Sequence, residues 1–302
     1  MKTTKPQAAS IHRERTSGLG SVRVSKATLI GAAVAMAVAP VWAADPAPER
    51  VVSLNVCTDQ LAMLLADPAQ LHSVSFLAKD PRVSSMVAEA DQFVINFARA
   101  EEIFLMQPDL VFAGALTSRA TVAMLQRFDI PVEILPHANS LEDVRDQILQ
   151  VGAALGQEDR AQELLKDFDQ RLSVLRAHSG ENPSAALYFA NGYTNGDATL
   201  AGQILLAAGF DNIASDVGYS VGGVLPLELL ALSEPDTVVV AQKYPGHSRS
   251  EAVLEHQVVQ DLRAAASTGS VSDRDWICGT PFVLRAIEAL GASRAEIMEI
   301  AP

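Results

Sequence analysis

Two segments of the chain, residues 101–111 and 228–238, repeat one another at a spacing of 127 positions. The first reads Glu-Glu-Ile-Phe-Leu-Met-Gln-Pro-Asp-Leu-Val and the second reads Glu-Leu-Leu-Ala-Leu-Ser-Glu-Pro-Asp-Thr-Val. Each predicts a short helix that starts at a glutamate, stops before a proline and continues through Pro-Asp into a buried strand. The repeat therefore predicts two related halves with a cleft between them.

The first 43 residues have the composition of a secretory signal peptide. Basic residues precede an apolar run at 27–38, which Pro40 ends shortly before Ala43. The run is shorter than a membrane span, which needs about 20 apolar residues. The alternative to a cleaved signal peptide is a segment that is retained as a membrane anchor. We expect cleavage near Ala43 and a soluble mature protein outside the cytoplasm. Its first cysteine, Cys57, is too distant from the apolar run for lipid attachment.

The mature chain is strongly acidic. Removal of residues 1–43 leaves 17 Lys and Arg against 35 Asp and Glu, a net charge of −18 over 259 residues. Such a surface repels phosphate backbones, so nucleic acid is not an expected partner. Cys57 and Cys278 lie at opposite ends of this chain and could pair in an oxidising compartment. Because spacing does not give the distance between their backbones, a disulfide and two separate thiols both stay open.

Short β-branched segments alternate with helical segments along both halves. Strands are predicted at 50–55, 71–75, 110–113, 132–135, 185–190 and 237–241. Helices are predicted at 60–66, 118–128, 200–208, 250–254 and 282–290, and a further helix runs to 155 from a cap at Ser140. This alternation predicts an α/β protein with mostly parallel sheets covered by helices.

The segment 158–177 is predicted to be one amphipathic helix, because its apolar residues recur at spacings of three and four. It lies between the two repeat copies and can join them as a stiff strut of about 30 Å that permits only limited rocking. The predicted organisation is a signal peptide at 1–43, an N-terminal lobe at 49–156, a connecting helix at 157–178 and a C-terminal lobe at 183–302.

Glu101 and Glu228 occupy the same place in the two repeat copies, at the start of a helix. The helix dipole stabilises a carboxylate there by about 0.3 to 1 kcal/mol, and this effect alone could account for both residues. The functional alternative is one exposed carboxylate per lobe, each positioned to bind arginines of a partner that contacts both lobes.

Ligands of parallel sheets bind outside the carboxyl ends of the strands, where several aromatic residues fall in predicted loops. Trp276 precedes Cys278 and a helix start, and Cys57-Thr58-Asp59 forms the analogous turn of the first lobe, so both cysteines are expected to face one cleft. Each aromatic residue could instead serve packing. The predicted ligand contacts are Cys57, Thr58, Phe76, Asn96, Tyr193, Tyr219, Tyr244, Trp276 and Cys278.

Two other functional classes stay open. The run Gly218-Tyr219-Ser220-Val221-Gly222 matches the nucleophile elbow of serine hydrolases, with Asp236 and His247 or His256 downstream in the required order. Its flanking residues, however, do not predict the strand and helix that an elbow needs. A bare divalent metal site would have to combine distant loops, because the histidines form no close-spaced motif, and His137 at a strand end is its candidate.

The signal peptide, the duplicated α/β halves and the helical strut together resemble the periplasmic substrate-binding proteins of ABC importers for ferric siderophores and cobalamin. The most specific elements of this likeness are the two Glu-x6-Pro-Asp units, at 101–109 and 228–236, and the Asp275-Trp276 turn. The resemblance implies a bilobal periplasmic protein with a helical backbone that is not an enzyme. Glu101 and Glu228 would then bind arginines of the inner-membrane permease.

The resemblance also implies the cargo. A ferric siderophore, a cobalamin-like corrinoid or haem would be captured in the cleft by a monomer and delivered to the permease. The protein itself is expected to need no cofactor and no resident metal. An anionic chelate would require local positive charge, for which the candidates are Arg82, Arg99, Arg119, Lys243 and Arg249.

Overall fold

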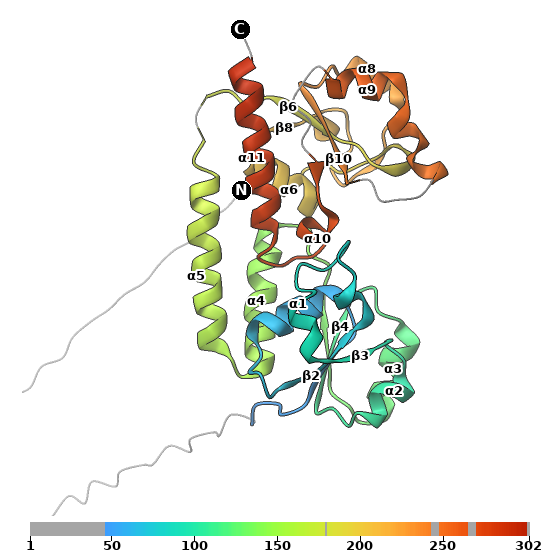
Figure 1. Cartoon of the computed structure of the whole chain (residues 1–302), viewed down its shortest axis with the longest axis vertical. Helices are drawn as coiled ribbons and strands as arrows, with labels where there is room; N and C mark the ends of the chain where they lie inside the picture. Colours follow the sequence, from blue (N-terminus) through green and yellow to red (C-terminus); the bar gives the residue numbers. More distant parts are fainter. Residues whose placement is uncertain (1–45, 179, 243–247, 265–269, 301–302) are drawn as a thin grey trace, which may run out of the picture. The chain divides into compact units, whose positions relative to one another are not determined.

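The computed structural model describes residues 46–178, 180–242, 248–264 and 270–300 (Figure 1). Asp45–Pro302 forms one compact unit, and the predicted signal peptide at 1–43 lies outside the described residues. Within the described part, no helix is both long and apolar enough to cross a membrane. Two main parallel sheets, one from each half of the repeat, organise this unit.

The N-terminal lobe is built on a five-stranded parallel sheet of order β3-β2-β1-β4-β5. Its strands are β1 (Val51–Ser53), β2 (Leu71–Ser75), β3 (Val94–Asn96), β4 (Leu110–Gly114) and β5 (Val132–Leu135). Its helices are α1 (Val56–Leu65), η1 (Phe76–Lys79), η2 (Glu89–Gln92), α2 (Ala100–Leu105), α3 (Arg119–Arg127) and α4 (Leu141–Leu155). Val51 and Val52 belong to separate core clusters, because successive strand side chains point to opposite faces.

The C-terminal lobe has a four-stranded parallel sheet of order β11-β10-β6-β8 and a two-stranded antiparallel ribbon of β7 and β9. Its strands are β6 (Ser184–Leu187), β7 (Tyr193–Thr194), β8 (Asp211–Asn212), β9 (Gly223–Val224), β10 (Thr237–Ala241) and β11 (Ser270–Val271). Its helices are η3 (Ala190–Gly192), α6 (Leu200–Ala207), α7 (Ile213–Asp216), α8 (Leu227–Leu232), η4 (Arg249–Glu255), α9 (Gln257–Ala264), α10 (Asp273–Trp276) and α11 (Val283–Ile300).

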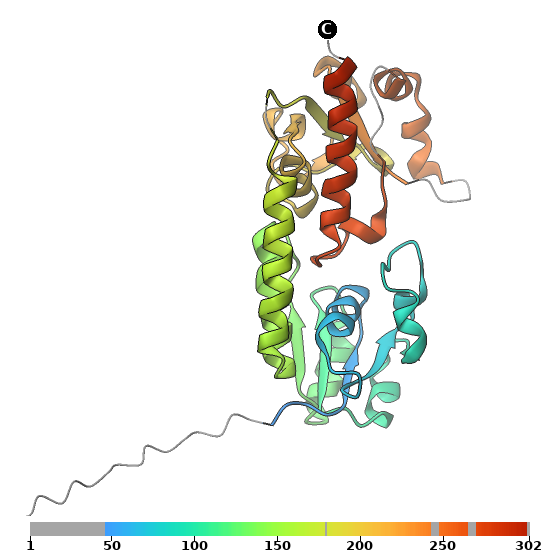
Figure 2. The same ribbon diagram turned by 60° about the vertical axis from the view of Figure 1, so that its left-hand side comes forward.

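The helix predicted at 158–177 is present as α5 (Glu158–Leu175), which passes from the N-terminal to the C-terminal lobe (Figure 1). It packs against α4 and α11, and Figure 2 shows the three helices on one side of the two sheets. A Cβ atom at Gly152 would collide with the Cβ of Ala161, so glycine permits the close approach of α4 and α5. One core cluster includes Val144, Phe168 and Ile287 from these helices. The lobes are therefore joined by a shared hydrophobic core as well as by one helix.

The sequence repeat is also a repeat in structure. Helix α2 and strand β4 have the same limits as α8 and β10 when 127 is added to each residue number. Gln107 and Glu234, which occupy the same place before the proline, both adopt positive φ angles, 52° and 43°. The Asp109 carboxylate accepts hydrogen bonds from the backbone N–H of Glu49 and Arg50 at 2.7 and 2.9 Å. Asp109 thus holds the chain just before β1, the first strand of its lobe.

Asp236, the equivalent aspartate of the second lobe, holds the start of β6 through a single residue. Asp236 Oδ2 accepts hydrogen bonds from the N–H and the hydroxyl of Ser184, both at 2.7 Å, where β6 begins.

Several predicted limits differ from the structure. Helix α1 starts four residues before the predicted position 60, because the Asn55 side chain caps it by accepting a bond from Cys57 N–H. The helix predicted at 250–254 is a 3-10 helix, η4, and the helix predicted at 282–290 continues to Ile300. Strands β3, β8 and β11 and helix α9 were not predicted.

Candidate ligand-binding site

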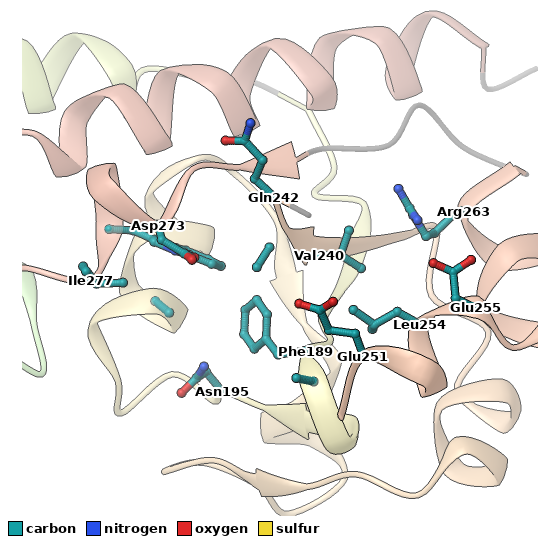
Figure 3. Close-up of a pocket in the computed structure, with 14 residues that line it drawn as sticks. Phe189, Asn195, Val240, Gln242, Glu251, Leu254, Glu255, Arg263, Asp273 and Ile277 are labelled. Atoms are coloured by element: carbon teal, nitrogen blue, oxygen red, sulfur yellow. The ribbon is translucent and has the colours of Figure 1, made fainter. Parts of the chain in front are cut away.

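A cavity of about 630 Å³ lies at the carboxyl ends of β6 and β10 (Figure 3). Phe189 follows β6, Gln242 follows β10, and α10 contributes one wall. Figure 3 shows Asp273 and Ile277 at one side of the cavity and Glu255 and Arg263 at the other. A volume of this size suits a small-molecule ligand, and its place agrees with the predicted edge of a parallel sheet.

Two aromatic rings form the inner wall of this cavity. Phe189 and Trp276 make an edge-to-face contact with ring centroids 5.2 Å apart, and Trp276 is almost fully buried. The indole Nε1–H of Trp276 donates to Asp273 Oδ1 at 3.3 Å, which orients the ring. The wall is thus held in position by packing and by a hydrogen bond within α10.

The charged residues of the cavity are mostly acidic. Glu251, Glu255 and Asp273 line it, and Arg263 is the one cationic residue among the described lining residues. Arg263 Nε is buried and has no hydrogen-bond partner in the described part of the chain. Gln242 and Asn195 add amide groups (Figure 3). The lining therefore offers aromatic surface, amide hydrogen bonds and more negative than positive charge.

A narrower groove of about 110 Å³ lies between the lobes. The N-terminal lobe contributes Asn55, Cys57 and the loops that follow β4 and β5, and the C-terminal lobe contributes Ile277 and Gly279. Ile277 lines both the groove and the larger cavity. The cavity and the groove are therefore neighbours that share one lining residue.

Cys57 and Cys278 form a disulfide between the lobes, with their Cα atoms 5.1 Å apart. This decides the alternative that the sequence left open in favour of pairing. Beside the disulfide, the Ser85 hydroxyl hydrogen-bonds to Asp275 Oδ1 at 2.9 Å and to the Arg274 carbonyl at 3.2 Å. Covalent and polar links therefore join the two lobes, and neither cysteine is a free thiol.

The structure places the predicted ligand contacts in several environments. Trp276 lines the cavity, and Cys57 and Thr58 line the groove. The Thr58 side chain is buried and bonded to the Ser53 hydroxyl and the Asn55 carbonyl, and the sulfur of Cys278 is buried in the disulfide. Asn96 is fully buried, and its amide donates to the Ser53 carbonyl and the Ser73 hydroxyl. Asn96 therefore links strands of the sheet and does not reach the cavity.

Three further aromatic predictions, Phe76, Tyr193 and Tyr219, do not line the cavity. Phe76 stacks on Phe97 with ring centroids 5.5 Å apart, and both side chains are about half exposed. Tyr193 and Tyr219 lie at the ribbon of β7 and β9, close to Gly222 and Gly223. Tyr244, like Lys243 and His247, falls outside the described residues.

Sequence reasoning missed Phe189, Gln242, Glu251 and Arg263. Phe189 lies at the end of the strand predicted at 185–190. Its position at the carboxyl end of a strand is therefore the same signal that predicted the other aromatic ligand contacts. Glu251 and Arg263 belong to η4 and α9, and neither residue was among the predicted ligand contacts.

The proposed elbow around Ser220 lacks the necessary backbone. Helix α7 precedes it and strand β9 follows it, which is the reverse of the strand-to-helix turn that exposes a catalytic serine. The Asp236 carboxylate is bonded to Ser184. For the metal alternative, His137 lines the groove, but the described residues contain no group of three or more His, Cys, Asp or Glu side chains that could hold an ion.

A buried carboxyl group lies two residues after Cys57. Burial raises the pKa of Asp59 from 3.8 to about 7, and hydrogen bonds from Ser53 and Ser75 offset part of this effect. Ser75 N–H donates to Asp59 Oδ1 at 3.1 Å, and the Ser75 hydroxyl lies 2.6 Å from Oδ2. The group has no access to solvent, so it affects stability and not ligand contact.

Glu101 and Glu228 are exposed in the first turns of α2 and α8. Figure 1 shows α2 and α8 on the opposite side of their lobes from α5. The two carboxylates are exposed at equivalent places of the repeat.

Residues 51–272 match the family model described as periplasmic binding protein. A cobalamin-binding protein of Halobacterium salinarum (strain ATCC 29341 / DSM 671 / R1) is 27% identical over 234 residues, which are 75% of this chain and 63% of that protein. A vitamin B12-binding protein of Pectobacterium carotovorum subsp. carotovorum (strain PC1) is 29% identical over 183 residues, which are 58% of this chain and 64% of that protein. The chain thus spans less than two thirds of the length of these relatives.

Solved structures share the fold. A periplasmic heme-binding protein from Roseiflexus sp. RS-1 in apo form aligns with a TM-score of 0.65 and 19% identity, covering 82% of this chain and 99% of that chain. A periplasmic vitamin B12 binding protein of Vibrio cholerae aligns with a TM-score of 0.62 and 18% identity, covering 83% and 98%. The predicted fold of two α/β lobes with mostly parallel sheets is confirmed. By its sequence match over residues 51–272, the chain belongs to the periplasmic binding protein family.

Proposed function

We propose that this protein is the solute-binding component of an ABC importer and that it captures a metal chelate in the space formed by the cavity and the groove. The observation that carries the proposal is that Ile277 lines both the cavity at the carboxyl edge of the second sheet and the groove between the lobes. Membership of the periplasmic binding protein family supports it. The protein would work in the periplasm as a monomer and perform no chemistry on its cargo.

A cobalamin-like corrinoid is the first candidate for the cargo, ahead of a ferric siderophore or haem. Two relatives carry the names cobalamin-binding and vitamin B12-binding protein. The periphery of a corrinoid is rich in amide groups, which Gln242 and Asn195 can hydrogen-bond. Haem carries propionates and catecholate chelates are anionic, so Glu251, Glu255 and Asp273 would repel them. Arg263 offers only one compensating positive charge among the described lining residues.

The exposed carboxylates Glu101 and Glu228 would dock the loaded protein on arginines of the inner-membrane permease. They occupy matching places in the two lobes and lie on exposed helical turns. A carboxylate and a guanidinium form geometrically specific bonds, so one contact per lobe can define the orientation of the complex.

The test uses the mature chain and its tryptophan fluorescence. Trp276 is the one tryptophan in residues 44–302, so the emission reports on the cavity wall alone. The protein would be titrated with cyanocobalamin, a ferric hydroxamate, a ferric catecholate and hemin, and free N-acetyltryptophanamide would correct for absorption by the ligands. We expect saturable quenching, strongest for cyanocobalamin, and equilibrium dialysis should give the same order of affinities. Lack of saturable binding by every chelate would refute the proposal.

Phe189→Ala supplies the matched variant. Loss of its ring removes half of the aromatic wall and should weaken binding about tenfold or more, since a truncated buried aromatic contact typically costs 1 to 2 kcal/mol or more. Phe128→Ala is the same truncation at a partly exposed residue that lines neither the cavity nor the groove, and it should leave the affinity unchanged.

A further inference from the structure

Each repeat copy exposes one large apolar side chain at the same position. Leu105 is 79% exposed and Leu232 is 81% exposed, and the two residues are again 127 positions apart. Leu105 follows Glu101 by four residues on α2, and Leu232 follows Glu228 by four residues on α8. Residues four apart lie on the same face of a helix. Each lobe therefore presents a carboxylate and a leucine next to one another.

The two leucines contribute little to the folded core. On the same helices, the side chains that fill the interior are Ile103 and Leu230, which are both fully buried. A single exposed leucine needs no explanation, because much of any protein surface is apolar. The recurrence of nearly the same exposure at the equivalent place in the second lobe is an independent observation, and it indicates a common role for both residues.

The apolar surface is larger on the N-terminal lobe. Phe104 lies beside Leu105, is half exposed, and contacts Phe128 with ring centroids 4.7 Å apart. Phe104, Leu105 and Ile130 line a shallow depression of about 260 Å³ together with Gln107 and Pro108. The residue equivalent to Phe104 in the second lobe is Ala231, so the C-terminal lobe offers the leucine without an aromatic neighbour.

We propose that Leu105 and Leu232 are matched apolar anchors that dock on the importer permease beside Glu101 and Glu228. The inference rests on the proposed function and adds residues and a partner geometry to it. Two identical acid-and-leucine pairs call for a receptor that presents one basic and apolar surface twice. A permease composed of two identical chains has that property, because its symmetry repeats every surface patch. The acidic charge of the mature chain favours a basic receptor surface.

The division of labour between the two residue types follows from their chemistry. Glutamate to arginine contacts are attractive over distance and weaken as salt screens them, whereas the leucine contacts exclude water and depend little on salt. The carboxylates would thus govern the rate of encounter, and the leucines would govern the lifetime of the complex.

The experiment measures binding of the mature protein to the purified permease of the source organism in lipid nanodiscs, by biolayer interferometry at low and high salt. Leu105→Ala and Leu232→Ala should each weaken binding by about three- to tenfold through faster dissociation, and the double variant by more than tenfold. The salt dependence should stay that of the wild type. Val174→Ala truncates another exposed apolar side chain, which is 70% exposed on α5, and should leave permease binding unchanged.

Chelate binding by the same variants separates this inference from the proposed function. Cyanocobalamin quenching of Trp276 should be within twofold of the wild type in every leucine variant, because neither leucine lines the cavity or the groove. If the double variant binds both the chelate and the permease as tightly as the wild type does, the leucines have no docking role, and the proposed function is unaffected. An effect limited to one of the two leucines would overturn the twofold receptor. If the wild-type protein binds no chelate, the proposed function itself is overturned.

Discussion

Cys57, in the first turn of α1, forms a disulfide with Cys278, which follows α10 in the sequence. This covalent link joins the two lobes at the groove that we assign to the ligand. The two residues are 221 positions apart in the sequence. Cys57 lines the groove, whereas Cys278 is buried. The disulfide restricts how far the lobes can separate at this point.

Removal of this disulfide should destabilise the protein substantially. In the unfolded chain the bond closes a very long loop, and the loss of that constraint is expected to cost about 2 to 5 kcal/mol of unfolding free energy. Urea unfolding of Cys57→Ser/Cys278→Ser against the wild type measures the difference. A reducing agent should lower the stability of the wild type to that of the double variant and leave the double variant unchanged. Equal sensitivity of both proteins to the reductant would contradict the prediction.

Asp59 should make the protein less stable as the pH rises. The pKa of this carboxyl group is raised from 3.8 to about 7 by burial, so the folded state binds the proton more tightly than the unfolded state. Stability is then greatest below pH 3.8 as far as this group is concerned, and it declines up to about pH 7 by roughly 4 kcal/mol. Other groups add their own dependence, so the informative quantity is the difference between variants.

Asp59→Asn removes this titration and keeps both contacts to Ser75, since the amide can accept from the N–H and donate to the hydroxyl. Its unfolding free energy relative to the wild type should rise between pH 4 and pH 7. Asp146→Asn, which removes an exposed charge from α4, serves as the control and should show no such trend. A constant difference between Asp59→Asn and the wild type over this range would rule out the buried titration.

Asp109 and Asp236 should have equal structural roles. Each carboxylate accepts two hydrogen bonds at the start of the first strand of its lobe. We expect Asp109→Ala and Asp236→Ala each to lower the unfolding free energy by about 1 to 3 kcal/mol, because donors of the chain lose a charged acceptor. Asn at either position should restore part of the loss. Chemical denaturation checks this, and a large effect at only one site would show that the repeat is not structurally equivalent.

The charge of the cavity should influence which chelate binds. Glu251 lines the cavity, so Glu251→Gln removes one negative charge without a change in size. The ratio of hemin affinity to cyanocobalamin affinity should increase by about threefold to tenfold, because haem carries propionates. Parallel dialysis with both ligands measures the ratio. Glu163→Gln on α5, which does not line the cavity, is the control. An equal increase of the affinity ratio in this variant would show that the effect comes from the overall charge of the protein.

Glu101→Ala and Glu228→Ala should separate transport from capture. Neither residue lines the cavity or the groove, so the chelate affinity should stay within twofold of the wild type. Uptake by a reconstituted importer should decrease by about tenfold in the double variant, since charged pairs at interfaces contribute on the order of a tenfold change in affinity. A decrease in chelate affinity would place these carboxylates in the ligand site instead.

Local patterns were sufficient where an element depends on its own residues. Strands β2 (Leu71–Ser75) and β5 (Val132–Leu135) have the predicted limits, and α4 begins at the predicted cap. The Ser140 hydroxyl accepts from Asp143 N–H there, and the Asp143 carboxylate accepts from Ser140 N–H. Strands β8 and β11 were missed, because two residues carry no periodicity and their pairing depends on β6 and β10.

The sequence by itself determined the duplication, the exposed glutamate at each repeated helix start, and the two α/β lobes. These features follow from residue order, because helix starts, turns and strand runs are formed by neighbours in the chain. Only the tertiary structure decided that Cys57 and Cys278 pair and that Phe189, Glu251 and Arg263 surround one cavity. Those residues come from separate elements, and their distances depend on how the sheets and helices pack, which no local pattern specifies.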